Sequence, residues 1–344
     1  MMKELIFGKT YALTDELAEE LDRIDPVLRA AYEYQKQFPD YCIPYSYWTD
    51  KDERLYIRWD MADGTEDRPV WRYFFDKNNA FCAEKIKRNL SKKELLRGNN
   101  LDAPVITITG DTHRKFERLL SFTQRFGVVD GDLMIILGDA CINYYGNGKD
   151  DLIKYRLSKL GIKLFCIHGN HEMRPGSTGL YSEKVWNGGK VYVEDKYPFL
   201  MFAKDGEIYD IGGYKTLVIG GAYSVDKYYR QSQGYQWFSD EQPSGETRAF
   251  VERQLEKHDW SVDVVLSHTV PYKYRPVDHF IQGLDQSTVD SGTERWLGEI
   301  EERLTYKRWY AGHFHCDRDI DELKIMYRKV CLFMNDTDLG FEMV

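Results

Sequence analysis

The sequence lacks any apolar run long enough to cross a membrane. Its longest apolar stretches are the length of β-strands, well short of the about 20 residues that a membrane helix needs. The opening residues, 1–5 (MMKEL), also lack the apolar core of a signal peptide, so we expect no export. The six cysteines form no C-x-x-C pair, which indicates a reducing compartment without a disulfide framework. These absences predict a cytoplasmic protein with no membrane partner.

An excess of basic residues is absent as well. There are 47 lysines and arginines against 56 aspartates and glutamates, which gives a net charge of −9. Such a chain is a poor candidate for broad, sequence-blind binding of nucleic acids or membrane surfaces. With 344 residues, of which 42% are hydrophobic, the chain can still bury a full core. We therefore expect a globular protein with one large domain or two ordinary ones.

Residues 1–100 differ in pattern from the rest of the chain. The pattern predicts a helix over about 14–34, strands over 54–60 and 69–75, and a basic amphipathic helix over 82–100. We interpret residues 1–100 as a small α+β module of unknown role, joined to a second domain over residues 101–344.

Short, almost continuously apolar runs alternate with helical stretches after residue 101. Such runs predict strands that are covered on both faces, and hence a layered α/β fold. The predicted strands lie at 105–109, 133–137, 163–167, 217–219 and 262–266. The predicted helices between them lie at 115–126, 150–160 and 244–257.

Polar clusters follow all of these strands except 217–219, and a fifth cluster follows the aromatic stretch that starts at Trp309. The clusters read TGDTH (109–113), LGDACIN (137–143), HGNHE (168–172), SHTVPY (267–272) and GHFH (312–315). Loops at the C-terminal ends of strands converge on one edge of an open α/β sheet. We therefore expect the five clusters to share one cleft.

The residue types in these clusters indicate a metal site. Six of the eight histidines lie there, and all of them except His168 are candidate site residues, together with Asp111, Asp139 and Asn170. Imidazole and oxygen ligands without thiolate suit two borderline cations such as Mn²⁺, Fe or Zn²⁺, rather than Ca²⁺, which prefers oxygen alone. The two oxygens of a carboxylate such as Asp139 can bridge ions about 3.5–4 Å apart, the spacing found in two-metal hydrolases.

The ordered series GDTH, GDACIN, GNHE, SH and GHFH resembles the calcineurin-like metallophosphoesterase superfamily, over roughly residues 104–320. The resemblance implies a four-layer αββα sandwich, phosphoester hydrolysis and two divalent metal ions, with Mn²⁺ expected first and Fe or Zn²⁺ as alternatives. His171 would be the acid beside the leaving oxygen. The resemblance also implies Asp111, His113 and His315 as ligands of the first metal, Asn170, His268 and His313 as ligands of the second, and Asp139 as the bridge.

Departures from the family pattern bear on the substrate. Many members have an acidic residue three positions after the bridging aspartate, but this chain has Ile142 there, and Asn143 could orient His171 by hydrogen bonding instead. The arginines with which protein Ser/Thr phosphatases hold phosphate are missing from their usual places. We therefore predict Arg174, together with Asn143, as substrate contacts. The second histidine of GHFH favours the phosphodiesterase and nuclease branches.

We predict a metallophosphoesterase that acts on a phosphodiester or nucleotide. Its partner would be a phosphorylated small molecule, a nucleotide or a nucleic-acid end. One alternative is a phosphomonoesterase for a phosphoprotein or small molecule, and another is a weakly catalytic, metal-bearing scaffold, which Ile142 suggests. The aromatic stretch 223–238 is interpreted as an ordinary loop or dimer contact in preference to a base-stacking surface, and an oligomer stays open.

Overall fold

The computed structural model describes residues 10–11, 45–49, 55–58, 71–75, 81–85, 96–97, 102–280 and 286–340. The chain divides into two compact units, residues 1–98 and 99–344. No helix in the described ranges has both the length and the apolar character needed to span a membrane.

The first unit contains a five-stranded antiparallel sheet in the order β1-β2-β3-β4-β5. Its strands are β1 (Thr10–Tyr11), β2 (Tyr45–Thr49), β3 (Leu55–Arg58), β4 (Trp71–Phe75) and β5 (Phe81–Lys85). The strands predicted over 54–60 and 69–75 are present. The helix predicted over 82–100 is wrong at its start, because β5 pairs with β4 along its whole length. The helix predicted over 14–34 lies outside the described residues, so the α+β module stays a prediction.

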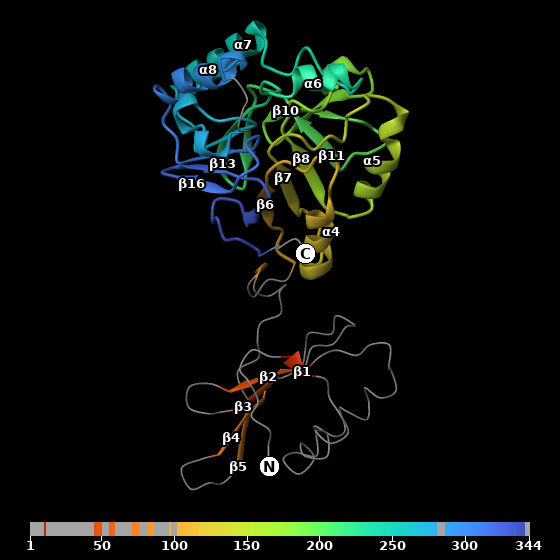
Figure 1. Cartoon of the computed structure of the whole chain (residues 1–344), viewed down its shortest axis with the longest axis vertical. Helices are drawn as coiled ribbons and strands as arrows, with labels where there is room; N and C mark the ends of the chain where they lie inside the picture. The colour runs from red at the N-terminus through yellow and green to blue at the C-terminus, as the bar shows by residue number, and fades with distance from the viewer. Residues whose placement is uncertain are drawn as a thin grey trace. The chain divides into compact units, whose positions relative to one another are not determined.

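The second unit contains two mixed sheets, which confirms the α/β class (Figure 1). The seven-stranded sheet has the order β18-β6-β7-β8-β11-β10-β9. Its strands are β6 (Ile106–Thr109), β7 (Leu133–Ile136), β8 (Lys163–Cys166), β9 (Ser182–Trp186), β10 (Gly189–Val193), β11 (Leu200–Ala203) and β18 (Val330–Leu332).

The six-stranded sheet has the order β12-β13-β14-β15-β17-β16. Its strands are β12 (Ile208–Ile211), β13 (Tyr214–Ile219), β14 (Val264–Ser267), β15 (Arg308–Ala311), β16 (Arg318–Ile320) and β17 (Leu323–Ile325). The five strands predicted after residue 101 are all present, within one to three residues at each end. The strands β6, β7 and β8 pair in parallel in one sheet, and β13, β14 and β15 do so in the other. Within each set of three, the C-terminal ends therefore lie at the same edge.

Four of the five α-helices described in the second unit bury apolar side chains, and the helix over Lys227–Ser232 has no buried residue. The helices are α4 (Glu117–Phe126), α5 (Asp151–Ser158), α6 (Lys227–Ser232), α7 (Gly245–Lys257) and α8 (Gly292–Glu301). Short 3₁₀ turns occur at Gly148–Asp150, Pro175–Ser177, Tyr272–Tyr274, Val277–His279 and Gln286–Thr288. The start of α7 follows from its sequence, because Ser244 Oγ accepts a hydrogen bond from the Thr247 amide at 3.1 Å.

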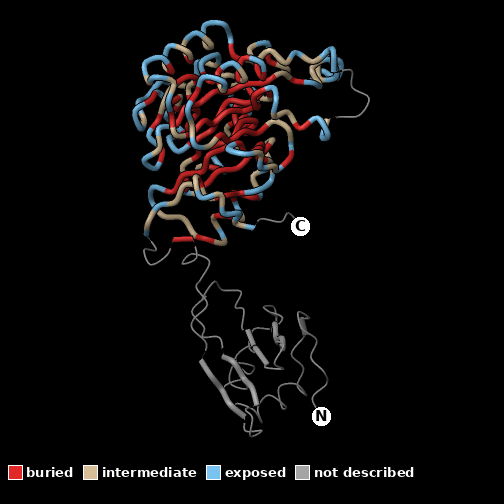
Figure 2. The backbone as a smooth tube through the Cα atoms, turned by 90° about the vertical axis from the view of Figure 1, so that its left-hand side faces the viewer, coloured by how far each residue is buried: buried red, intermediate tan, exposed pale blue. Residues whose placement is uncertain are grey.

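Two of the apolar cores formed by described residues support the second unit. One lies between the sheets and joins residues such as Phe165 of the first with Leu266 and Tyr310 of the second. The other lies between the six-stranded sheet and helices α7 and α8, where Leu255 and Trp296 contact the face that bears Trp309. Figure 2 shows the buried backbone concentrated in the strands, with exposed residues at the periphery of the unit. Both sheets are therefore rigid supports for the loops at their edges.

Candidate metal centre

The register of the parallel strands brings the polar clusters together. Thr109 of β6 pairs with Ile136 of β7, and Ile136 pairs with Cys166 of β8, so these three strands end side by side. In the second sheet Ser267 of β14 pairs with Ala311 of β15 in the same way. Loop residues that are distant in sequence thus emerge from aligned strand ends, which is the arrangement expected from the strand pattern.

The loops that carry the candidate ligands turn sharply. His113, Asp139, His313 and His315 have positive φ angles of 46°, 47°, 68° and 51°. Neighbouring glycines are required by space: a Cβ atom on Gly138 would overlap His268 Nδ1, and one on Gly169 would overlap Asp139 Oδ1. The GD and GN pairs of the sequence motifs therefore have a steric cause. Left-handed backbone at non-glycine residues is typical of functional sites.

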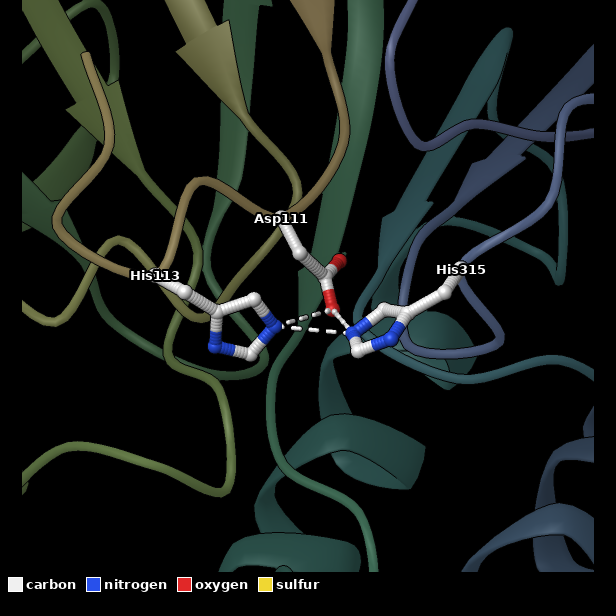
Figure 3. Close-up of side chains that lie close together, drawn as sticks. All are labelled: Asp111, His113 and His315. Carbon is white, nitrogen blue, oxygen red and sulfur yellow. Dashed lines mark hydrogen bonds and ion pairs between the residues drawn. The ribbon is translucent and has the colours of Figure 1, made fainter. Parts of the chain in front are cut away.

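We call Asp111, His113 and His315 the outer cluster. Figure 3 shows the two imidazole rings converging on the Asp111 carboxylate. His113 Nε2 and His315 Nε2 lie 3.6 and 3.2 Å from Asp111 Oδ2, and 2.8 Å from each other. The side chain of Asp111 is buried, but those of His113 and His315 are 28% and 47% exposed. His315 also stacks on the ring of Tyr327, with centroids 4.7 Å apart.

We call Asn170, His268 and His313 the inner cluster. Asn170 Oδ1 lies 2.8 Å from His268 Nε2 and 3.1 Å from His313 Nδ1. His268 is completely buried, and Asn170 is only 2% exposed. Desolvation of the ring, followed by the neighbouring His268, lowers the pKa of His313 to about 3, so this imidazole is neutral and can offer a lone pair.

Asp139 lies between the two clusters. Its Oδ2 atom is 4.0 Å from His113 Nε2 of the outer cluster and 3.6 Å from His268 Nε2 of the inner cluster. Its Oδ1 atom accepts a hydrogen bond from the His171 amide at 2.8 Å, which fixes the carboxylate. Burial by itself would raise the pKa of Asp139, but electrostatic interactions with the imidazoles of His171 and His268 outweigh it and lower that pKa below its usual value.

The donor atoms of the site fit divalent cations. His268 Nδ1 lies 2.8 Å from the Leu137 carbonyl oxygen and must donate to it, so His268 Nε2 presents a lone pair. In the neutral ring that lone pair faces another acceptor, Asn170 Oδ1, and a cation bound by both atoms would stabilise this contact. Asp111 Oδ2 is likewise buried with no hydrogen-bond donor in the described part of the chain.

Two overlapping groups of ligand atoms are close enough for coordination. Those of Asp111, His113 and His315 lie within 4.8 Å of one another, and so do those of Asp111, Asp139 and His268. Although burial would raise the pKa of Asp111, the imidazoles of His113 and His315 hold it well below its usual value. Two buried carboxylates that stay ionised together attract cations strongly.

His171 lies at the edge of this centre. Its Nε2 atom is 3.9 Å from Asp139 Oδ2, and its side chain is 16% exposed. The pKa of His171 is lowered: desolvation and the charge of Arg230 lower it, and they outweigh Asp139, which raises it.

Asn143 donates its side-chain amide to the Met173 carbonyl at 2.9 Å. Neither Asn143 Oδ1 nor His171 Nδ1 has a hydrogen-bond partner among the residues that the structure describes.

Arg174 pairs with residues outside the two clusters. Its Nη1 atom is 2.6 Å from Asp205 Oδ2, and its Nε atom donates to the Asp240 carbonyl at 2.7 Å. It lines a cavity together with Tyr192 and Phe250, and none of the seven candidate ligands lines that cavity. The structure therefore brings together the seven candidate ligands and His171, but it does not bring Arg174 to them.

Sequence reasoning missed the residues that hold Asn170. Asn170 Nδ2 donates to Ser224 Oγ at 2.8 Å, and Ser224 in turn contacts the buried carboxylate of Glu241. Ser224 follows β13, the one predicted strand without a polar cluster directly after it. No sequence signal near Ser224 points to this contact, because it joins the ends of strands that lie in different sheets. The aromatic stretch 223–238 contains α6, on which Tyr228 and Tyr229 are exposed.

The chain is similar to known proteins over most of its second unit. The family model for calcineurin-like phosphoesterases matches residues 104–317. The chain is similar to the solved structure of TT1561 of Thermus thermophilus at 11% identity and a TM-score of 0.40, with 68% of this chain and 96% of that one covered. A second solved structure matches at 12% identity and a TM-score of 0.37, with the same shares of 68% and 96% covered. No curated protein sequence shows significant similarity to the chain.

Proposed function

The chain belongs to the calcineurin-like phosphoesterase family and is a metal-dependent phosphoesterase, and from this premise we propose that it hydrolyses a phosphodiester or a nucleotide. The observation that carries the proposal is the convergence of seven imidazole, carboxylate and amide side chains from five strand ends on one edge of the two sheets. We further propose the four-layer αββα order of the family for residues 101–344. A cytoplasmic location and the oligomeric state stay predictions.

We propose that the outer cluster holds one divalent ion and the inner cluster a second, with Asp139 shared by both. The position of Asp139 Oδ2 between His113 and His268 supports this sharing. The absence of thiolate from the ligand set favours Mn²⁺, with Fe or Zn²⁺ as alternatives. Cys141 is near His113, but burial raises the pKa of its thiol well above the usual value, so it stays protonated.

Bound divalent ions in such a site lower the pKa of a water nucleophile and neutralise charge on the phosphoryl oxygens. The residues of the chain then have separate tasks. Asp111 and Asp139 supply negative charge that holds the ions, and their own hydrogen bonds from the His313 and His171 amides fix both carboxylates. His171, partly exposed beside Asp139, is placed to give a proton from Nε2 to the departing oxygen.

The proton-donor role of His171 is tested by replacement. His171→Ala should lower kcat by about 10²–10⁴ for a substrate with a poor leaving group, and much less for a p-nitrophenyl ester, whose leaving group needs no proton. Equal losses for both substrates would contradict proton donation. An unchanged low activity would instead favour the alternative of a metal-bearing scaffold with weak catalysis.

The substrate class is tested by a direct comparison of two esters. We expect the Mn²⁺-loaded full chain to hydrolyse bis-p-nitrophenyl phosphate with a higher kcat/KM than p-nitrophenyl phosphate. A preference for the monoester by several decades would defeat the diester proposal and favour a phosphomonoesterase. Arg174 and Asn143 as substrate contacts stay predictions, and the ion pair of Arg174 with Asp205 lends them no support.

A further inference from the structure

We infer that Glu241 is a positioning residue that, through Ser224, fixes the orientation of the Asn170 side-chain amide toward the metal site. This inference rests on the proposed function, since it takes Asn170 to be a ligand. Glu241 follows α6 in sequence and is 71 positions from Asn170, and it is not part of any cluster that the sequence singled out.

The hydrogen bonds run in one direction only. The Glu241 carboxylate accepts from the Ser224 amide at 3.1 Å, from Ser224 Oγ at 2.6 Å and from Trp237 Nε1 at 2.9 Å. A carboxylate surrounded by three donors acts as an acceptor, so the Ser224 hydroxyl proton points to Glu241. The Ser224 oxygen is then left to accept, and the group that it faces at 2.8 Å is Asn170 Nδ2.

This direction decides which end of the Asn170 amide faces the imidazoles. With Nδ2 committed to Ser224, Oδ1 points at His268 Nε2 and His313 Nδ1. Metal ligation needs the oxygen there, because the amide nitrogen carries protons and has no lone pair to give. The chain from Glu241 through Ser224 to Asn170 therefore supplies the orientation that a ligand requires.

A competing arrangement explains why the orientation has to be held. His268 Nδ1 donates to the Leu137 carbonyl, so His268 Nε2 presents a lone pair to Asn170. Without an ion, a flipped Asn170 would donate Nδ2–H to that lone pair and gain a hydrogen bond. The flipped state would occupy the His268 lone pair and turn Oδ1 away from the site. Glu241 and Ser224 disfavour this flip, because it would face Asn170 Oδ1 with the Ser224 oxygen, which has no proton to donate.

The surroundings of Glu241 keep it in place. The side chain is 3% exposed, and the Trp237 ring that donates to it is covered by the Lys227 ammonium, 4.1 Å from the ring centroid. Replacing Glu241 by glutamine keeps its size and gives it a donor as well as an acceptor. A glutamine can donate to Ser224 Oγ, which frees the hydroxyl proton for Asn170 Oδ1 and permits the flip.

The test is a titration of the metal-free full chain with Mn²⁺ by isothermal titration calorimetry. We expect two binding events in the unmodified chain. Glu241→Gln should weaken one event by about 10–100-fold, the scale for groups that orient a ligand, and leave the other within about twofold. At saturating Mn²⁺ its kcat should return to near the unmodified value, while the Mn²⁺ concentration for half activation rises. A purely structural defect would lower kcat at every Mn²⁺ concentration.

Two further variants keep the result interpretable. Glu252→Gln is the matched control, because Glu252 also accepts from a tryptophan, Trp296 Nε1, at 2.9 Å but has no link to a candidate ligand. It should leave both events unchanged. Ser224→Ala removes the acceptor for Asn170 but keeps two donors to Glu241, the backbone amide of residue 224 and Trp237 Nε1. It should weaken the same event as Glu241→Gln.

Asn170→Ala separates this inference from the proposed function. If Asn170→Ala removes one event while Glu241→Gln and Ser224→Ala bind both ions as the unmodified chain does, the positioning role is wrong and the metal assignment stands. If Asn170→Ala keeps both events at full affinity, Asn170 is not a ligand and the proposed metal assignment fails with it.

Discussion

The outer and inner clusters share Asp139 as a neighbour but are held in opposite ways. The imidazoles of the outer cluster are 28% and 47% exposed, and ring contacts such as that of His315 with Tyr327 orient them. In the inner cluster His268 is buried, and directed hydrogen bonds with Leu137 and Ser224 fix it and Asn170. The imidazoles of the outer cluster are therefore the more exposed, and most of the inner cluster is buried and held by directed hydrogen bonds.

This difference indicates a division of labour between the two positions. A buried, pre-oriented ligand set binds an ion tightly and releases it slowly, because water reaches it poorly. An exposed set exchanges its ion more readily and is accessible to a substrate oxygen. We expect the inner position to retain its ion during purification and the outer position to depend on added metal.

The largest effect should come from removing the group that both clusters share. Asp139→Asn should lower kcat by at least about 10³-fold and weaken both Mn²⁺-binding events, because it removes a central charge from a dry site. Kinetics and calorimetry on the same sample measure both effects. Asp132→Asn is the control, since Asp132 also accepts backbone hydrogen bonds, from Val105 and Val129, but is outside the ligand set. Loss of only one binding event in Asp139→Asn would contradict a shared position.

Replacing one histidine in each cluster should change the free energy of unfolding by different amounts. His268→Ala leaves the buried Leu137 carbonyl without its donor and should lower the free energy of unfolding by about 1–3 kcal/mol even without metal. His315→Ala, at an exposed position, should lower it by less, by no more than about 1 kcal/mol, mainly through loss of the stack on Tyr327. Urea unfolding in a chelator measures both values. Equal losses of stability in the two variants would contradict the difference in burial between the inner and the outer cluster.

The smallest effect should come from replacing Tyr327, whose ring supports the imidazole of His315. Tyr327→Leu removes the ring stacked on His315 and should weaken only the outer Mn²⁺-binding event, by about two- to tenfold, since an aromatic pair contributes about 0.5–1.5 kcal/mol. Tyr327→Phe retains the ring and should bind like the unmodified chain. If the leucine variant weakened the inner event instead, the assignment of His315 to the outer position would be wrong.

The sequence predicts the strands and the gathering of the site well, because both depend on local patterns. Short apolar runs such as 133–137 can be covered only as interior strands, and polar residues directly after them must lie at the sheet edge. The start of α7 was predictable from Ser244 for the same reason, since a capping residue acts on its own turn.

Contacts between distant loops could not be predicted in this way. The partner of Arg174 depends on where Asp205 lies, which is set by the β11–β12 connection and not by the loop that carries the arginine. The link from Asn170 to Ser224 joins the ends of strands in different sheets, and nothing near either residue encodes it. The strand β5 takes the first residues of a predicted helix because pairing with β4 overrode the helical apolar pattern there.

The positive φ angles at His113, Asp139, His313 and His315 restrict which amino acids these four positions accept. Left-handed backbone is tolerated by glycine, asparagine, aspartate and histidine, and poorly by β-branched or bulky residues. All but glycine in that short alphabet carry a lone pair on a short side chain. Apart from glycine, the residues that these turns accept can therefore still donate electrons to a cation, so the torsion angles help to preserve the coordination chemistry.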